Sequence, residues 1–323
     1  MASPSSALAT QRPDLAASFM EFDMAMGASG FVAQRVMPIV EVAKAAGNFG
    51  LIPIEQLLMG RTTDRAPGSR YNSGTMTFLP ATYSCKEHGW EEPVDDNEAQ
   101  MYRDYFDLEQ IAAVRAYRAV LENYEKRVAA AIFNTSTWTG ASLTTAVGTP
   151  WSTVATATPA ADVEAAAQKV FLNCGMWPNA VIMSRKTFRN VRNCVSVVDR
   201  IKYAGITDPR AGAITEAAIG QLFDLDNVIV AGSAKNTAIE GQAATLASIW
   251  ADTNVMVCKI ATDRDIRTPC IARTFHFGED GSEVGGHTES YRDEARRSGI
   301  VRVRHQVDEK VLYVEAGHLL TNT

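Results

Sequence analysis

Apolar residues recur every three or four positions through one long stretch of the chain, residues 102–133. The positions are Leu108, Ile111, Val114, Tyr117, Leu121, Tyr124, Val128 and Ile132. This spacing predicts an amphipathic helix, which at 1.5 Å per residue is about 40 Å long. Arg118, Glu122 and Lys126 follow at four-residue intervals on another face, which we therefore expect to be solvated.

Period-two alternation predicts strands within residues 69–96. Residues 75–80 read as one strand and residues 81–87 as a second, before a break at Gly89 and Trp90. A two-stranded arm of this kind has almost no apolar face of its own, and an isolated hairpin is at best marginally stable in water. We therefore expect it to pack on another part of this chain or on another chain.

Residues 150–261 alternate between helix and strand signals. Asp162 can cap a helix whose apolar face is Val163, Ala166, Ala167, Val170 and Phe171, with Gly175 just beyond its end. Further elements are a strand at 180–184, a helix carrying Phe188, Val191, Val195 and Val198, a helix capped by Thr215, a strand at 227–231 and a strand within 248–261. This order predicts a compact α+β module.

The two ends of the chain show less periodicity. Residues 1–48 are rich in Ala, Ser and Met, and despite the aromatic and Met positions Phe19, Phe22, Met26 and Phe31 they predict an extended arm. Residues 262–323 return to strand character at 270–277, 300–307 and 310–317, the last two joined through Asp308 and Glu309. An acidic, Gly-rich loop lies between the first two of these strands.

Composition narrows the classes of function. The chain has 323 residues, 46% apolar and 21% charged, and a formal net charge of −6, which argues against affinity gained by neutralising phosphates. No apolar run approaches the roughly 20 residues that span a bilayer, and the N-terminus lacks signal-peptide features, so we expect a cytosol-like compartment. The five cysteines are widely spaced without a CxxC pair and are interpreted as small buried hydrophobes.

No group of residues predicts an active site. Phosphate-binding and dinucleotide-binding glycine motifs are absent, and the five histidines are far apart with no HExxH pattern, so neither a cofactor nor a metal is expected. The acidic run at 91–96 is interpreted as a charged rim. One enzymatic alternative stays open, with Cys85 as nucleophile and His88 as base, although a hairpin without a pocket is a poor place to lower the pKa of a thiol.

The order of arm, polar hairpin, long helix, α+β module and returning strands resembles the major capsid proteins of tailed bacteriophages with the Hong Kong 97 fold, a fold that encapsulin shells share. The resemblance covers essentially the whole chain. It rests on residues 65–99, 103–136, 214–238 and 249–261.

The resemblance implies an α+β fold in five parts. These are an N-terminal arm (1–48), an extended loop (49–101), a peripheral domain with a spine helix (102–149), an axial domain (150–261), and returning peripheral strands with a C-terminal tail (262–323). The implied function is that of a structural, self-assembling major capsid protein, not an enzyme, whose hexamers and pentamers form an icosahedral shell around phage DNA. An encapsulin-type shell is the alternative.

The same resemblance implies partners and contacts. Scaffolding, portal and decoration proteins are expected beside the chain itself, DNA is enclosed without sequence-specific binding, no membrane is involved, and the protein is located in the virion after assembly in the host cytoplasm. In this fold the extended loop lies over a neighbouring subunit. The implied intersubunit contacts are Arg61, Arg65, Arg70, Phe78, Tyr83, Trp90, Glu91, Glu92, Asp95 and Asp96.

Two features depart from some relatives. Lys86 is the only lysine of the loop and lies beside Glu87 near the hairpin base, so the isopeptide cross-link of certain capsids is not assigned here. The arm is also too short to hold a long scaffolding helix. Scaffolding is therefore expected as a separate chain or as a segment removed by a protease.

Overall fold

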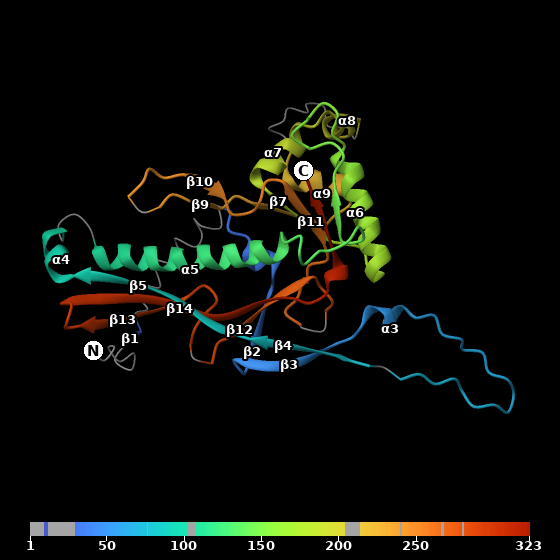
Figure 1. The fold of residues 1–323 in the computed structure, drawn as a ribbon, viewed down its shortest axis with the longest axis horizontal. Coiled ribbons are helices and arrows are strands. Elements are labelled where there is room, and N and C mark those ends of the chain that lie inside the picture. The colour runs from blue at the N-terminus through green and yellow to red at the C-terminus, as the bar shows by residue number, and fades with distance from the viewer. Residues whose placement is uncertain are drawn as a thin grey trace.

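The computed structural model describes residues 10–11, 30–75, 77–102, 107–203, 214–239, 241–265, 268–279 and 281–323. Figure 1 shows an elongated subunit with a long helix and sheet at one end, a helix-covered module above the other end, and a loop projecting beyond it. Phe19, Phe22 and Met26 of the predicted arm lie outside the described residues.

A six-stranded sheet is organised around β14 (Ser298–Val311). β5 (Lys86–Asp95) pairs antiparallel with one edge of β14, while β13 (His287–Asp293) and β12 (Ala272–Phe277) pair with the other. The outer strands are β1 (Thr10–Gln11) and β2 (Ile39–Val42). The predicted junction at Asp308 and Glu309 is wrong, because both residues pair in register with β12 inside one continuous strand.

The predicted spine helix is α5 (Leu108–Ile132), capped by the Asp107 carboxylate and preceded by α4 (Asp96–Tyr102). Its buried stripe follows the prediction from Tyr117 to Ile132. Ile111, however, is 41% exposed, so its assignment to the stripe is wrong. The fully buried Ala113 and Ala116 take that face instead, since small side chains let the helix approach the sheet closely.

The axial module contains a five-stranded sheet. Its strand order is β6 (Thr144–Ala146), β15 (Gly317–Thr321), β11 (Asn254–Cys258), β7 (Ala180–Ser184) and β8 (Asn227–Ala231). The helices on it are α6 (Pro159–Cys174), α7 (Arg185–Asn193), α8 (Val195–Tyr203) and α9 (Glu216–Phe223). The strands predicted at 180–184 and 227–231 are confirmed.

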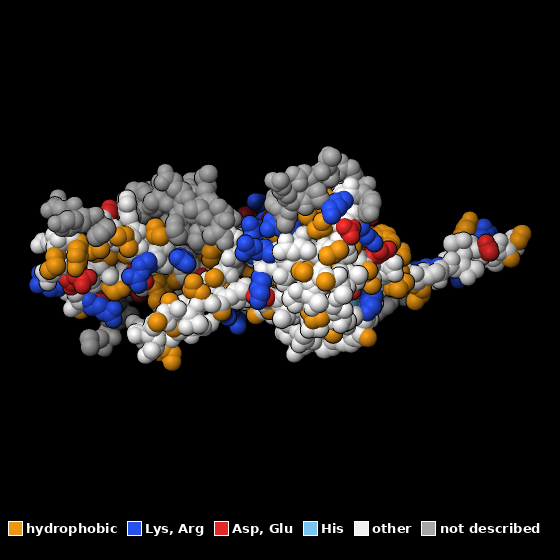
Figure 2. All heavy atoms as spheres, turned by 90° about the horizontal axis from the view of Figure 1, so that it is seen from above, with side chains coloured by type: hydrophobic (Ala, Val, Ile, Leu, Met, Phe, Trp, Pro, Cys, Tyr) orange, Lys and Arg blue, Asp and Glu red, His pale blue; other side chains and the backbone are white. Residues whose placement is uncertain are grey.

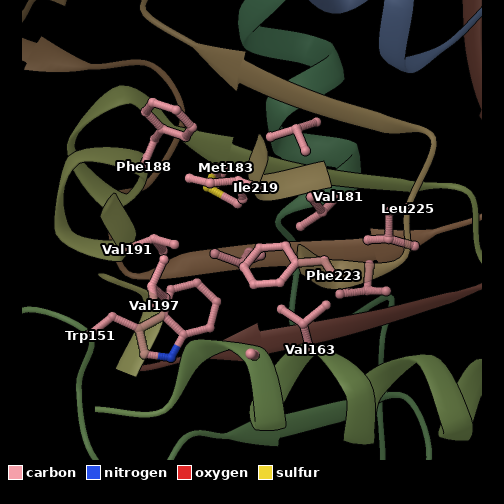
Figure 3. Packing of buried hydrophobic residues seen from close by; sticks show 14 of the residues in the cluster. Trp151, Val163, Val181, Met183, Phe188, Val191, Val197, Ile219, Phe223 and Leu225 are labelled. Atoms are coloured by element: carbon pink, nitrogen blue, oxygen red, sulfur yellow. The ribbon is translucent and has the colours of Figure 1, made fainter. Parts of the chain in front are cut away.

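Both faces of the axial sheet are covered. Val181 and Met183 pack among the helices α6 to α9, as Figure 3 shows. Ile182 and Met256, on the opposite face, pack with the C-terminal half of α5. The spine helix therefore belongs to two cores, that of the axial module and that formed with β5 and β14.

β15 belongs to the axial sheet, although it lies outside the axial domain that the resemblance implies. β15 lies between β6 and β11 in the axial sheet, whereas the resemblance implies peripheral strands and a tail for residues 262–323. The 3-10 helix η2 (Val314–Ala316) leads directly into it. The axial module is thus built from residues on both sides of the long sheet strands.

Two local helix predictions are wrong and two are confirmed. Thr158 is the N-cap residue of α6, and Asp162 instead accepts a hydrogen bond from Trp151 Nε1 at 2.8 Å. The helix expected through Phe188 and Val198 is two helices, α7 and α8, separated at Cys194. The Thr215 cap and the left-handed Gly175 (φ +70°) are confirmed.

The end of the predicted arm is part of the folded core. α2 (Ala33–Val36), β2 and β3 (Ala46–Leu51) follow Gly30, and Val36 is fully buried. The buried carboxylate of Glu125 on α5 accepts hydrogen bonds from the backbone amides of Val32 and Ala33, at 2.8 to 3.2 Å, and from Trp250 Nε1 at 2.6 Å. Burial raises the pKa of Glu125, while these hydrogen bonds act against the rise.

Candidate assembly surface

A two-stranded ribbon carries the projecting loop. β3 pairs antiparallel with β4 (Leu79–Ser84), from Ala46 opposite Ser84 to Leu51 opposite Leu79. Residues 52–78, including the short helix α3 (Ile54–Leu58), connect the two strands and extend away from the body, with residue 76 outside the described part (Figure 1).

The hairpin predicted between residues 75–80 and 81–87 is wrong, because β4 pairs with β3 and β5 pairs with β14. The sequence predicts that the strand ends at Gly89 and Trp90, yet Gly89 lies inside β5 opposite Arg304. A Cβ atom there would be 3.1 Å from the carbonyl oxygen of Val303. A glycine inside a strand often marks such a close approach of backbones, and this one does.

Aromatic packing anchors the base of the ribbon. The ring of Tyr83 stacks on Phe275 of β12 with centroids 4.9 Å apart, and Phe49 lies 5.3 Å from the same ring. The Ser84 amide donates to Asp308 Oδ2 at 2.9 Å. Tyr83, one of the expected contact residues, is therefore engaged within its own subunit.

The loop itself exposes apolar side chains. Leu58, Met59, Tyr71, Phe78 and Leu79 are all more than half exposed, with Tyr71 at 75%. Figure 2 shows hydrophobic side chains along the loop and where it leaves the body. An exposed apolar surface of this kind is typical of a contact region. The sequence analysis predicts only Phe78 of these five as a contact, although Leu58, Met59 and Tyr71 directly flank the polar run at 60–70.

The expected basic contacts lie on the same loop. Arg61, Arg65 and Arg70 are exposed. Arg65 donates to the Ser69 carbonyl at 2.7 Å, and its guanidinium lies 4.4 Å from the centre of the Tyr71 ring. This local contact orders the turn and presents a cation beside an aromatic face.

The expected acidic contacts lie elsewhere, on the subunit's own sheet. Glu91 accepts a hydrogen bond from the Tyr291 hydroxyl at 3.1 Å. Glu92 accepts from Trp90 Nε1 at 2.9 Å and lies 3.6 Å from the Arg115 guanidinium. Both carboxylates on β5 thus have partners in their own chain.

Asp95 and Asp96 end β5 and begin α4. Asp95 Oδ1 accepts from the Asn97 amide at 2.8 Å. Arg292 donates to both oxygens of Asp96 at 2.6 Å, and these bonds lower the pKa of Asp96. The structure therefore does not bring the ten expected contact residues together: Arg61, Arg65, Arg70 and Phe78 lie on the projecting loop, Tyr83 lies at the base of the ribbon, and the other five lie along β5 and the start of α4. Their role between subunits stays a prediction.

The alternative nucleophile has unsuitable surroundings. Burial, with Asp308 nearby, raises the pKa of Cys85 to about 11, and burial also lowers the pKa of His88. Because the thiolate is the nucleophile, these shifts oppose catalysis. Within the described ranges, no three metal-ligating side chains come together and no helix has the length and apolarity to cross a bilayer.

A buried histidine lies between the spine helix and the sheet. His305 of β14 is fully buried, with Nδ1 3.0 Å from the Val284 carbonyl and Nε2 3.3 Å from Arg127 Nη2. Nδ1 must carry the proton to donate to the carbonyl, so Nε2 is the acceptor. Burial, with Arg127 nearby, lowers the pKa of His305 to about 4.

This arrangement predicts acid sensitivity. The folded pKa of about 4 lies below the unfolded value of 6.5, so the unfolded chain binds more protons between them and stability falls as pH falls through that window. From about pH 7.5 to about pH 5, we expect His305 to cost about 2 kcal/mol. Urea unfolding of the parent and the His305→Gln variant measures this. Equal losses in both chains would contradict the assignment.

The fold is one used by shell-forming proteins, as comparison with solved structures shows. A phage-related protein from Bordetella bronchiseptica RB50 matches with a TM-score of 0.67 at 19% identity, over 91% of this chain and 92% of that one. The capsid of cyanophage P-SCSP1u matches at 0.59 and 10% identity, over 88% and 86%. The holo-SrpI encapsulin of Synechococcus elongatus PCC 7942 matches at 0.50 and 10% identity, over 91% and 87%.

Comparison with known protein sequences finds a phage protein that is similar to part of this chain. The major capsid protein of Burkholderia phage BcepMu is 25% identical over 202 residues, which are 62% of this chain and 63% of the relative. No protein-family profile matches the chain. The α+β fold of phage capsid proteins, expected from the sequence as the Hong Kong 97 fold, is confirmed.

Proposed function

We propose that the chain is a major capsid protein, the structural subunit of an icosahedral phage shell. The observation that carries the proposal is the projecting loop at 52–78, whose apolar side chains its own subunit leaves exposed. In a shell, a neighbouring copy covers them. Weak contacts repeated by symmetry then suffice for a stable assembly.

The finer parts of the proposal follow from this role. Hexamers and pentamers form the shell, which encloses DNA without reading its sequence, and separate scaffolding, portal and decoration proteins complete the particle. The virion is the final location, after assembly in the host cytoplasm. An encapsulin-type shell is the less favoured alternative, because its likeness is weaker than the two phage likenesses described above and the sequence relative is a phage major capsid protein.

Sedimentation velocity and negative-stain microscopy of the purified chain test the proposal. We expect capsomers or closed shells, formed by the chain alone or when scaffolding protein is supplied. A chain that stays monomeric at high concentration under both conditions contradicts the proposal. Co-purified DNA-packaging components support the capsid, whereas an enclosed enzyme supports the encapsulin.

Charge reversal on the loop gives a specific prediction. Changing both Arg65 and Arg70 to Glu is expected to weaken assembly, because the loop then carries negative charge towards an acidic neighbour. High salt screens exposed charges and should restore part of the assembly. The matched control changes Arg200 and Lys202, exposed on α8, to Glu. If both double variants assemble alike at low salt, the basic loop residues are not contacts.

A further inference from the structure

A second projection leaves the axial module on the side away from the extended loop. β9 (Ala234–Asn236) and β10 (Leu246–Ser248) pair antiparallel, and we call residues 234–248 the finger, of which residue 240 is not described. Figure 1 shows the finger directed towards the α4 end of the subunit, whereas α6 and the extended loop lie towards the other end.

Hydrogen bonds within the finger stabilise it, but two of its apolar side chains are exposed. Asn236 Oδ1 accepts from the amides of Ala238 and Thr245, at 3.0 and 2.9 Å. Ile239 is 81% exposed and Leu246 is 73% exposed. A two-stranded hairpin is only marginally stable alone, and exposed edges with few charges invite further pairing. The finger therefore has the properties of a contact element.

A matching surface lies at the C-terminal end of α6. We define the α6 patch as Phe171, Leu172 and Trp177. The rings of Phe171 and Trp177 are stacked with centroids 4.7 Å apart, and Leu172 is 79% exposed. Residues 171–177 include no charged side chain, and the finger sequence includes only Lys235 and Glu240. The two surfaces are thus both apolar and nearly uncharged.

The α6 patch adjoins the base of the extended loop. Gly175 follows α6, and a Cβ atom built there would lie 2.9 Å from Leu58 Cδ1 of α3. A neighbour on this side that receives the loop also lies beside the patch. Its own finger extends back towards the first subunit, because finger and loop project in opposite directions (Figure 1).

We infer that the finger of one copy docks on the α6 patch of the next copy. The contact is head-to-tail, so repeating it by rotation closes a ring. Loop and finger then link the same pair of copies from opposite sides. This inference rests on the proposed function, since it assigns a contact within the assembly.

Cross-linking of assembled particles tests the contact. Cysteines are placed by Ile239→Cys and Leu172→Cys in one chain and treated with a short bis-maleimide after assembly. We expect linked dimers and a ladder up to the ring size, and only monomers from either single variant. The control pair is Ile239→Cys with Val154→Cys, an exposed position elsewhere on the module.

The cross-linking results test the finger contact independently of the proposed shell function. Particles that form without the ladder overturn the finger contact and leave the shell proposal intact, whereas a parent chain that forms no assembly overturns the shell proposal.

Substitution provides a second test. Leu246→Asp and Leu172→Asp should each raise the subunit concentration needed for assembly by about tenfold or more, because a charge enters an apolar contact. Both positions are exposed, so thermal unfolding of the free subunit should not change. Pairing Leu246→Asp with Leu172→Lys should recover assembly. Single variants that assemble like the parent overturn the inference.

Discussion

Replacing residues 61–75 with a short Gly-Ser linker should abolish shell formation and leave the subunit folded. The replaced residues lie beyond the β3 and β4 pairing and beyond the aromatic anchor at Phe275, so their loss removes no core contact of the subunit. We expect the free energy of unfolding to change by less than about 0.5 kcal/mol. Assembly fails because the exposed Tyr71 and the three arginines are lost.

The replacement must end before β4 and β5, because both strands belong to the folded subunit. A linker spanning 61–96, the range of the ten expected contact residues, would delete β5 and the buried Val94 and unfold the sheet. Sedimentation velocity measures shell formation, and urea unfolding measures the stability of the subunit. Tyr71→Ser with Phe78→Ser serves as a milder variant, and Val154→Ser as the matched change of an exposed apolar residue elsewhere. Closed shells from the linker variant would show that the loop is not required, and its unfolding would place the loop in its own subunit's core.

Leu121→Asp should unfold the subunit. Leu121 is 6% exposed and packs with Val301 and Val303 between α5 and the sheet. An aspartate there loses apolar burial and leaves a carboxylate without solvent, at a cost of about 3 to 5 kcal/mol. That loss is a large part of a typical domain's stability. We expect an insoluble chain or a greatly lowered urea midpoint.

Ile111 on the same helix gives the matched control. It is 41% exposed, so Ile111→Asp makes the same chemical change on the solvated side of α5. Its expected cost is below about 1 kcal/mol. Comparable losses in the two variants would mean that the buried face of the spine helix is assigned wrongly.

Local patterns in the sequence predicted much of the fold. Helix periodicity located α5 because most of its length rests on one continuous surface, and Thr215 and Gly175 marked true helix ends. Strand pairing was harder, since alternation shows that a segment is extended but not which strand lies beside it. Residues 75–80 and 81–87 are therefore predicted as the two strands of one hairpin, although β4 pairs with β3 and β5 with β14.

The surroundings of the expected contact residues are only partly predictable for the same reason. The exposed loop with Arg61, Arg65 and Arg70 follows from its polar, Gly-containing sequence. The partners of Glu91 and Asp96, Tyr291 and Arg292, both lie in β13, about 200 positions later. The sequence likewise does not distinguish Glu125 from the other charged residues of this helix. Its partners at Val32, Ala33 and Trp250 exist only after three distant segments have met.

The position of β15 determines when the axial module can finish folding. Residues 317–321 occupy an interior place in the axial sheet, between β6 and β11. A nascent chain on the ribosome leaves that place open until synthesis has passed Thr321, and the apolar sheet around it stays incomplete. Copies truncated before this point by premature termination would lack a finished axial module. The axial sheet can therefore close only after translation, once β15 has been released to pair with β6 and β11.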